Sequence, residues 1–387
     1  MSTQATASAT LESLLTRLVN QQQSQQAQLD AIRDAFKANK DEGPGVNYLA
    51  YIPKIRPAVV KLAGEKGIAI EWEDGHQSFF DKEFLKIHPS PENLVEFHKD
   101  VPRKPWNKDQ ITASDLFIQY DDVKTPSGLL RAMNQLWQYG LLFIRGVSNV
   151  QTDNATCELC NLVSLFSNIR PTFYGELWDV QNKSDSRENI AYTDLKLVFH
   201  MDLLYFANPP RYQTLHCLRN RVKGGTSAFI DALHVAQQLK TLSPSDYNIL
   251  TQTPVPFQYV NGGRHYHQTH PIIQLSPTGD LIEYVNYGPP FQAPLLLSTP
   301  IEFYHALREF EKCLQDSRTI YRYTLQEGDA VFFDNRRVFH AQTAFRDHSQ
   351  GVSRGNISRW LKGCYFEEDI MWDRARSLRS KVPTVLT

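Results

Sequence analysis

Short β-type runs separated by turn residues constrain the fold of this chain more than any other feature. They recur through residues 112–387 without the regular alternation of strands and helices that a parallel sheet requires. The runs span residues 140–145, 212–218, 226–230, 272–275, 281–285 and 330–333. A helical stretch around residues 129–142 leads into them. The pattern predicts a mainly β domain over 112–387, an antiparallel sandwich or barrel with helices packed outside it.

Two further regions precede this domain. Residues 10–38 carry apolar or Gln side chains at steps of three and four, which describes one helical seam. We therefore expect residues 1–45 to be a helical arm and linker, either an oligomerisation arm that favours a homodimer or a helix lying on its own domain. We expect residues 46–111 to be a small N-terminal β domain, because alternating apolar residues precede an Asp74-Gly75 turn.

Composition narrows the function classes. Lys plus Arg number 41 and Asp plus Glu number 42, for a formal charge of -1, so no basic field favours nucleic acid as a partner. No run of about 18 apolar residues occurs, so we expect no membrane span. Five scattered cysteines favour a reducing compartment over a disulfide framework. With no recognisable secretory or mitochondrial leader, we expect a cytoplasmic protein.

A candidate metal site stands out from the rest of the sequence. His200 and Asp202 lie two residues apart in an extended segment, where alternate side chains share a face, so both can bind one metal ion. His340 ends a later β-type run. Two His and one carboxylate are the ligand set of non-haem Fe(II) oxygenases, because it leaves positions open for co-substrate and oxygen. A surface or hydrogen-bonded histidine is the alternative interpretation of each residue alone.

An arginine follows in a strand-like block, Ser358-Arg-Trp-Leu-Lys-Gly-Cys-Tyr365. A guanidinium on this strand can lie beside the metal, where it would bind a carboxylate with a two-pronged fork that Lys does not reproduce. Arg359 is therefore a candidate for an anionic co-substrate.

Four ordered blocks together resemble a known family. They are the His-x-Asp, a Gly224-Gly-Thr-Ser227 segment, an Asp334-Asn-x-Arg-x-x-His340 segment and the block around Arg359. This order is similar to the γ-butyrobetaine and trimethyllysine dioxygenase branch of the Fe(II)/2-oxoglutarate oxygenases, the wider taurine dioxygenase-like group. The resemblance implies a double-stranded β-helix, or jelly roll, with flanking helices. It also implies Fe(II), 2-oxoglutarate as co-substrate, and O2.

Carried over by position, the resemblance implies roles for the motif residues. His200, Asp202 and His340 would hold Fe(II), while Arg359 would pair with the distal carboxylate of 2-oxoglutarate, assisted by the Ser227 hydroxyl. Arg354 is the rival of Arg359, because an apparent insertion over residues 346–355 leaves the spacing from His340 undecided.

The resemblance also suggests how a substrate is bound. The positions that surround a trimethylammonium group in γ-butyrobetaine dioxygenases are aromatic here, and Asn residues stand in neighbouring blocks. The substrate-binding candidates are Tyr174, Trp178, Asn189, Tyr192, Asn286 and Tyr365. Aromatic faces attract a desolvated cation, so they can select a quaternary ammonium without a formal counter-charge. Filling of the core is the alternative role for any one of them.

Several departures from the family leave the substrate open. Leu203 and Leu204 follow the metal carboxylate where the carnitine-forming enzymes carry an aromatic residue and Pro, and the block after Asn286 lacks a second Asn. The small N-terminal domain lacks the cysteines that bind zinc in the family, so we expect no structural zinc.

We therefore expect a dioxygenase that hydroxylates an unactivated C–H bond of a small, cationic or zwitterionic ammonium-bearing carboxylate, like γ-butyrobetaine. The first alternative keeps the iron chemistry and acts on a free amino acid or specialised metabolite by hydroxylation, desaturation or cyclisation. The second is a catalytically silent jelly-roll binding module.

Overall fold

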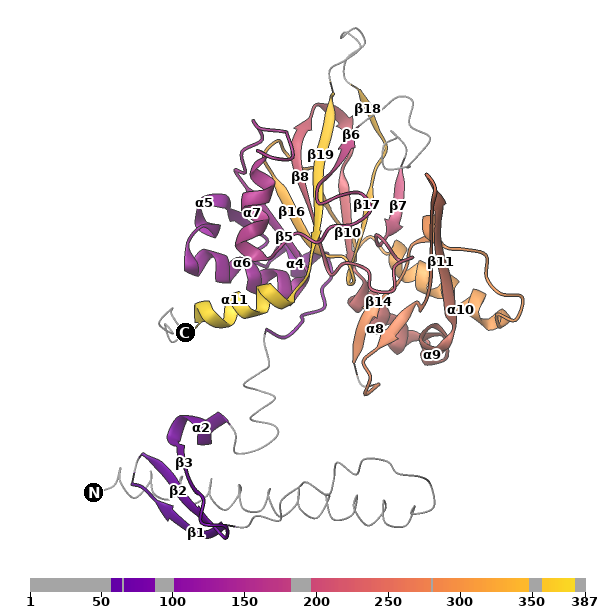
Figure 1. The fold of residues 1–387 in the computed structure, drawn as a ribbon. Coiled ribbons are helices and arrows are strands. Elements are labelled where there is room, and N and C mark those ends of the chain that lie inside the picture. Colours follow the sequence, from indigo (N-terminus) through magenta and orange to yellow (C-terminus); the bar gives the residue numbers. More distant parts are fainter. Residues whose placement is uncertain are drawn as a thin grey trace. The chain divides into compact units, whose positions relative to one another are not determined.

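The computed structural model describes residues 57–64, 66–87, 101–181, 196–279, 281–347 and 357–379 (Figure 1). The expected helical arm over 1–45 lies outside these ranges. The chain divides into two units, residues 1–100 and 101–387. The second unit begins earlier than the expected boundary at residue 111, because Trp106 and Ile111 are buried in its core.

The first unit contains a three-stranded antiparallel sheet. Its strands are β1 (Pro57–Leu62), β2 (Gly67–Trp72) and β3 (Gln77–Asp81), followed by helix α2 (Lys82–Ile87). The turn between β2 and β3 contains Gly75 in the left-handed region, at a φ of 83°. The core of this unit is small, consisting of Ile68, Ile70 and Leu85 with partly buried neighbours.

A six-stranded sheet forms one wall of the second unit, in the order β4-β5-β16-β8-β19-β6. Its strands are β4 (Phe117–Gln119), β5 (Leu141–Arg145), β6 (Trp178–Gln181), β8 (Tyr212–Asn220), β16 (Ala330–Asp334) and β19 (Arg359–Phe366). All neighbours pair antiparallel except β4 and β5. The expected mainly antiparallel sheet is therefore present.

A four-stranded sheet forms the opposing wall, in the order β15-β10-β17-β7. Its strands are β7 (Leu197–His200), β10 (Ser227–Asp231), β15 (Tyr321–Tyr323) and β17 (Val338–Gln342). Phe143 and Phe333 of the first sheet pack against Phe229 of the second, with ring centroids 5.8 Å apart in each pair. Two antiparallel sheets packed face to face are the jelly-roll architecture expected from the sequence. A short pair, β9 (Val222–Gly224) with β18 (Phe345–Asp347), extends from their edge.

Helices cover the outer face of the six-stranded sheet (Figure 1). They are α5 (Tyr120–Val123), α6 (Pro126–Tyr139), α7 (Glu158–Phe166) and α11 (Asp369–Arg379). The short helix α4 (Lys108–Thr112) instead packs through Ile111 into the core between the two sheets. The α6 helix begins at a Thr125 cap and ends before Gly140, which has a φ of 70°. The helix therefore stops three residues before the expected end at 142, and β5 begins at once.

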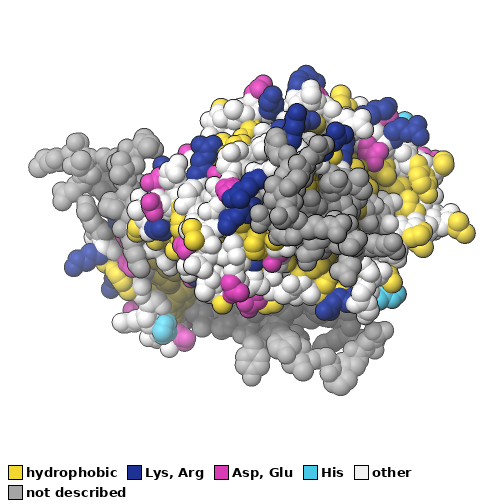
Figure 2. All heavy atoms as spheres, turned by 90° about the horizontal axis from the view of Figure 1, so that it is seen from above, with side chains coloured by type: hydrophobic (Ala, Val, Ile, Leu, Met, Phe, Trp, Pro, Cys, Tyr) yellow, Lys and Arg dark blue, Asp and Glu magenta, His cyan; other side chains and the backbone are white. Residues whose placement is uncertain are grey.

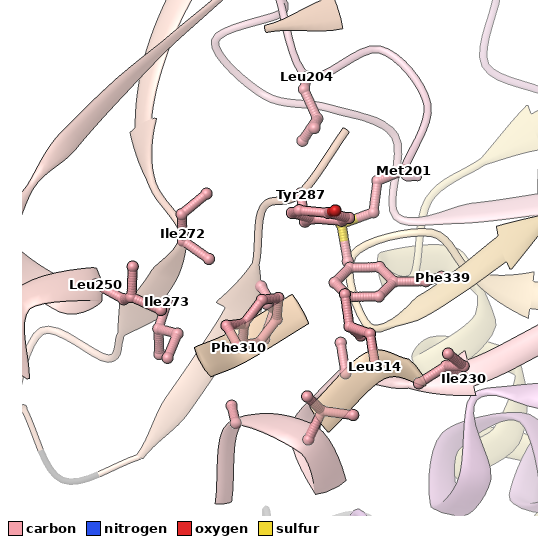
Figure 3. Packing of buried hydrophobic residues seen from close by; sticks show 14 of the residues in the cluster. Met201, Leu204, Ile230, Leu250, Ile272, Ile273, Tyr287, Phe310, Leu314 and Phe339 are labelled. Atoms are coloured by element: carbon pink, nitrogen blue, oxygen red, sulfur yellow. The ribbon is translucent and has the colours of Figure 1, made fainter. Parts of the chain in front are cut away.

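A long segment between β10 and β15 builds a second layer against the four-stranded sheet. It contains α8 (Ala232–Leu242), α9 (Pro244–Gln252), β11 (Pro254–Asn261), β12 (Arg264–Pro271), β13 (Ile273–Leu275), β14 (Ile282–Val285), η3 (Pro289–Phe291) and α10 (Ile301–Gln315). Figure 3 shows Tyr287 and Phe310 of this segment beside Phe339 of β17. Tyr287 and Phe339 have ring centroids 5.4 Å apart. This core supports the strand that carries His340.

The surface in Figure 2 mixes basic, acidic and apolar side chains over the face in view. Within the described residues, no helix is long and apolar enough to cross a membrane.

Candidate active site

The three residues of the predicted metal site meet between the two sheets. His200 is the last residue of β7, and it pairs across the sheet with His340 of β17. Asp202 follows β7 directly, with Oδ1 3.3 Å from His200 Nε2 and Oδ2 3.9 Å from His340 Nε2. One ligand atom from each residue lies within 4.8 Å of the other two. The His-x-Asp and the distal His are therefore brought together as the sequence predicts.

The donor set fits an iron ion. Metal–nitrogen bonds of about 2.1 Å place two ligand atoms at a right angle about 3 Å apart, and the Asp202 oxygens lie 3.3 and 3.9 Å from the two imidazole nitrogens. His200 Nδ1 lies 2.8 Å from the Val198 carbonyl oxygen, so it can donate its proton there and leave the Nε2 lone pair for a metal. Burial, followed by the nearby His200, lowers the pKa of His340 to about 3. A neutral imidazole is the form that binds metal.

The electrostatics of Asp202 also suit a ligand. Burial alone would raise the pKa of this carboxyl group, but the hydrogen bond with His200 and the proximity of His340 outweigh burial and lower it. Asp202 is therefore ionised at neutral pH. A hydrogen bond from the Tyr365 hydroxyl to Oδ2, at 2.9 Å, acts in the same direction.

A cavity lies beside the three residues, and its volume is about 900 Å³ when the solvent space at its mouth is included. Both sheets contribute to its walls. Its lining comprises Tyr174, Trp178, Val180, Leu197, His200, Asp202, Leu203, Tyr205, Gln213, Leu215, Ser227, Phe229, Phe291, His340, Ala341, Gln342, Leu361 and Tyr365. Most of these side chains are apolar or aromatic, so the site excludes water around the candidate metal ligands.

Arg359 is not among the residues that line the cavity, but it contacts Gln342, which is. Its Nη2 donates to Gln342 Oε1 at 2.6 Å, and Gln342 pairs across the sheet with Ser227. Arg359 is only 3% exposed, its Nε has no hydrogen-bond partner, and no carboxylate forms an ion pair with it within the described part of the chain. Burial lowers the pKa of this guanidinium to about 10. A buried cation without a counter-ion fits the distal carboxylate of 2-oxoglutarate.

A glycine turn makes room for this arginine. Gly225 has a φ of 65°, and a Cβ there would lie 3.3 Å from Arg359 Nε. The Gly-Gly-Thr-Ser motif therefore brings the backbone close to the guanidinium before Ser227 enters the cavity wall. Arg354, the rival anchor, lies outside the described residues.

Three of the predicted aromatic side chains line the cavity together. The ring centroids of Tyr174 and Trp178 are 6.4 Å apart, and those of Trp178 and Tyr365 are 5.5 Å apart. Gly363 of β19 pairs with Trp178, and a Cβ at Gly363 would lie 2.5 Å from two indole carbons. The glycine of the Arg359 block therefore allows the indole to lie flat on β19. Tyr192 and Asn189 fall outside the described residues.

The structure does not bring Asn286 to the cavity. Asn286 is fully buried, donates to the Pro271 carbonyl at 2.9 Å and accepts from Arg336 at 3.2 Å. Its amide is used for packing behind β14, so the expectation that it binds substrate needs correction. The sequence pattern identified Asn286 as a candidate, but it did not show which way the side chain points.

Sequence reasoning missed several residues that line the cavity, among them Tyr205, Gln213 and Phe291. Gln213 is 1% exposed, and its Oε1 has no hydrogen-bond partner. Its place in the β-type run 212–218, on the same face as Leu215, was the available signal. A buried carbonyl oxygen without a partner is unusual, and it suits a ligand that donates a hydrogen bond.

Comparisons with known proteins agree with this geometry. The model of the family described as "Taurine catabolism dioxygenase TauD, TfdA family" matches residues 102–365. The chain is 52% identical over 329 residues to "Dioxygenase str8" of Strobilurus tenacellus, with 84% of this chain and 77% of that protein covered. It is 29% identical to the γ-butyrobetaine dioxygenase of Homo sapiens, with 82% and 81% covered. It is also 29% identical to the mitochondrial trimethyllysine dioxygenase of Rattus norvegicus, with 84% and 75% covered.

Proposed function

The chain belongs to the taurine catabolism dioxygenase TauD, TfdA family and is an Fe(II)/2-oxoglutarate-dependent dioxygenase, and we propose that it oxidises a small ammonium-bearing carboxylate similar to γ-butyrobetaine. The product is the substrate hydroxylated at an unactivated C–H bond, with succinate and CO2 as co-products. The observation that carries the proposal is the group of aromatic rings of Tyr174, Trp178 and Tyr365 in the cavity that adjoins His200, Asp202 and His340.

These rings suit a quaternary ammonium group. Each aromatic face attracts a desolvated cation by roughly 0.5 to 2 kcal/mol, so several rings together bind it without a negative side chain. Apart from Asp202, no carboxylate is among the described residues that line the cavity. The γ-butyrobetaine and trimethyllysine dioxygenases at 29% identity agree with a trimethylated substrate.

The residues of the chain divide the work of the reaction. When bound, Fe(II) and 2-oxoglutarate supply the oxidising chemistry for the C–H bond. His200, Asp202 and His340 would hold the metal, with the protonated Nδ1 of His200 donating a hydrogen bond to the Val198 carbonyl oxygen. Arg359 and Ser227 orient the co-substrate, and the apolar walls keep water away.

A second candidate substrate class rests on a different observation. Asn286 is absent from the cavity lining, and Leu203 and Phe291 are present in it. Gln213 Oε1 has no hydrogen-bond partner among the described residues, and a trimethylammonium group has no proton to donate to it. These residues favour a free amino acid or a specialised metabolite with an N–H or O–H group, oxidised by the same iron chemistry.

The test is succinate formation from 2-oxoglutarate by the Fe(II)-loaded chain. The additions are γ-butyrobetaine, trimethyllysine, their non-methylated amines and a panel of free amino acids. Stimulation by the trimethylated compounds above their amines supports the proposal. Stimulation by the amines or amino acids alone moves the function to the second candidate.

Two variants sharpen this test. Asp202→Ala is expected to abolish turnover with every compound. Trp178→Leu is expected to raise the KM for a trimethylated substrate far more than the KM for its uncharged isostere. Equal effects of Trp178→Leu on both compounds would contradict a role of the ring in binding the cation.

A further inference from the structure

Two residues outside the metal triad hold the backbone and the side chain of Asp202. Asn335 lies in the turn between β16 and β17 and is fully buried. Its Oδ1 accepts the Asp202 backbone N–H at 2.9 Å, and its Nδ2 donates to the Asp202 carbonyl at 3.1 Å. The same Nδ2 donates to the Pro210 carbonyl at 3.1 Å. The peptide groups on both sides of Asp202 are therefore fixed by one side chain.

The backbone beside Asp202 is strained in a way that agrees with this restraint. Leu203 has a φ of 61° and, among the described residues, it alone adopts a positive φ without being glycine. Left-handed backbone at a non-glycine residue persists only where its surroundings over-determine it. The Leu203 carbonyl accepts the Phe206 N–H at 3.0 Å, which closes the turn that Asn335 anchors.

The two oxygens of the Asp202 side chain have different surroundings. The Tyr365 hydroxyl donates to Oδ2 at 2.9 Å, and Oδ1 lies 3.3 Å from His200 Nε2. Tyr365 is buried, at 2% exposed, and its ring packs on Trp178. The two carboxylate oxygens thus have different partners, a phenol for Oδ2 and a metal-ligating imidazole for Oδ1.

This difference matters for the number of open metal positions. A carboxylate that binds with both oxygens takes two positions of an octahedral ion, and one that binds with a single oxygen takes one. Two histidines and a carboxylate that binds through one oxygen leave three positions open, which is what co-substrate and oxygen need. An oxygen already hydrogen-bonded to a phenol is a poorer second ligand.

We propose that Tyr365 and Asn335 are positioning residues that keep Asp202 a metal ligand through Oδ1 alone. Asn335 fixes the backbone position from which the Asp202 side chain extends. Tyr365 holds Oδ2 in place through its hydrogen bond. The inference concerns the metal site and goes beyond the proposed substrate, so it stands or falls independently of it. It also gives Tyr365 a second role besides its place in the aromatic wall.

The test measures metal binding rather than turnover. Apoprotein is titrated anaerobically with Fe(II), and separately with Co(II), whose visible absorption reports coordination number. Tyr365→Phe removes only the hydroxyl and is expected to weaken metal binding roughly 10- to 100-fold, as loss of a residue that orients a metal ligand does. The Co(II) spectrum is expected to change toward higher coordination by the chain.

Tyr287→Phe is the matched control. The Tyr287 hydroxyl is also buried and also donates to a carboxylate, that of Glu311 at 3.0 Å, but it does not contact Asp202. The control is expected to bind both ions as the unchanged chain does, with the same Co(II) spectrum. Equal losses of affinity in the two variants would overturn the proposal, because they would indicate general loosening of the fold.

Two substitutions of Asn335 complete the test. Asn335→Asp keeps an acceptor for the Asp202 N–H and loses the donor, whereas Asn335→Leu loses both. Metal affinity is expected to be highest in the unchanged chain, lower in Asn335→Asp and lowest in Asn335→Leu. If Asn335→Leu does not fold, Asn335→Asp and Tyr365→Phe provide the test. Thermal unfolding of the metal-free variants separates lost stability from lost affinity. Unchanged metal affinity and spectrum in Tyr365→Phe would overturn the proposal.

Discussion

Arg359 provides the sharpest test of the co-substrate site. Its guanidinium is buried, it donates a hydrogen bond to Gln342, and burial lowers its pKa from 12.5 to about 10. At about 1.4 kcal/mol per pKa unit, that difference corresponds to roughly 3 kcal/mol of unfavourable burial. The distal carboxylate of 2-oxoglutarate would relieve this cost by forming an ion pair in the same apolar surroundings.

Replacement of Arg359 is therefore expected to weaken 2-oxoglutarate strongly. Arg359→Gln removes the charge and should raise the dissociation constant by about a hundredfold, the equivalent of roughly 3 kcal/mol. Arg359→Lys keeps the charge but loses the planar fork, so an intermediate loss is expected. The affinity for Fe(II) should change little, because the hydrogen bond of Arg359 is to Gln342 and not to a residue of the triad.

The assay is anaerobic titration of the Fe(II)-loaded chain with 2-oxoglutarate, followed by the visible absorption of the complex and by the KM in succinate formation. Arg354→Gln is the matched control, since it removes the rival guanidinium. An unchanged 2-oxoglutarate dissociation constant in Arg359→Gln would refute the reasoning. A large increase in Arg354→Gln instead would move the anchor to that residue.

Three further predictions follow from buried contacts. Gly363→Ala places a Cβ 2.5 Å from the Trp178 indole, so it should raise the KM for the organic substrate and leave metal affinity unchanged; an unchanged substrate KM would contradict the packing role. Burial lowers the pKa of His216 to about 4, so below a pH of about 6.5 the unfolded chain takes up a proton that the folded chain refuses. The free energy of unfolding should therefore fall by up to roughly 3 kcal/mol between pH 6.5 and 4. In urea unfolding at these pH values, His216→Leu should abolish the share of this decrease that is due to His216. Arg337 Nη2 lies 2.8 Å from Asp231 Oδ2, so Arg337→Met leaves Asp231 as a buried charge without its cation. The substitution should lower the free energy of unfolding by roughly 3 to 5 kcal/mol. A loss no larger than that of an ordinary surface substitution would contradict this estimate.

Several expectations stay predictions. The cytoplasmic location, the homodimer and the arm over residues 1–45 rest on the sequence alone, as do the roles of Tyr192, Asn189 and Arg354. Membership of the oxygenase family, by contrast, supports an enzyme and argues against the silent binding module.

The sequence by itself determined the fold class and predicted which three residues the structure brings together. A two-residue spacing in an extended segment puts His200 and Asp202 on one face, because side-chain direction in a strand has a period of two. The runs of short strands similarly indicated an antiparallel β fold, because hydrophobic periodicity is local information. Arg359 and the aromatic residues were identified through motifs, because the resemblance of a motif to a family suggests a role for each residue in it.

Only the tertiary structure decided which side chains share the cavity. Asn286 and Gln213 illustrate the limit, since the sequence favoured the first, yet the second lines the site and the first is used for packing. The place of Gln213 depends on the pairing of β8 with β16, more than a hundred residues away, and that of Asn286 depends on its contacts with Pro271 and Arg336. The same holds for the contacts of Asp202 with Asn335 and Tyr365, because no local pattern encodes a hydrogen bond that forms only when two distant turns and strands meet.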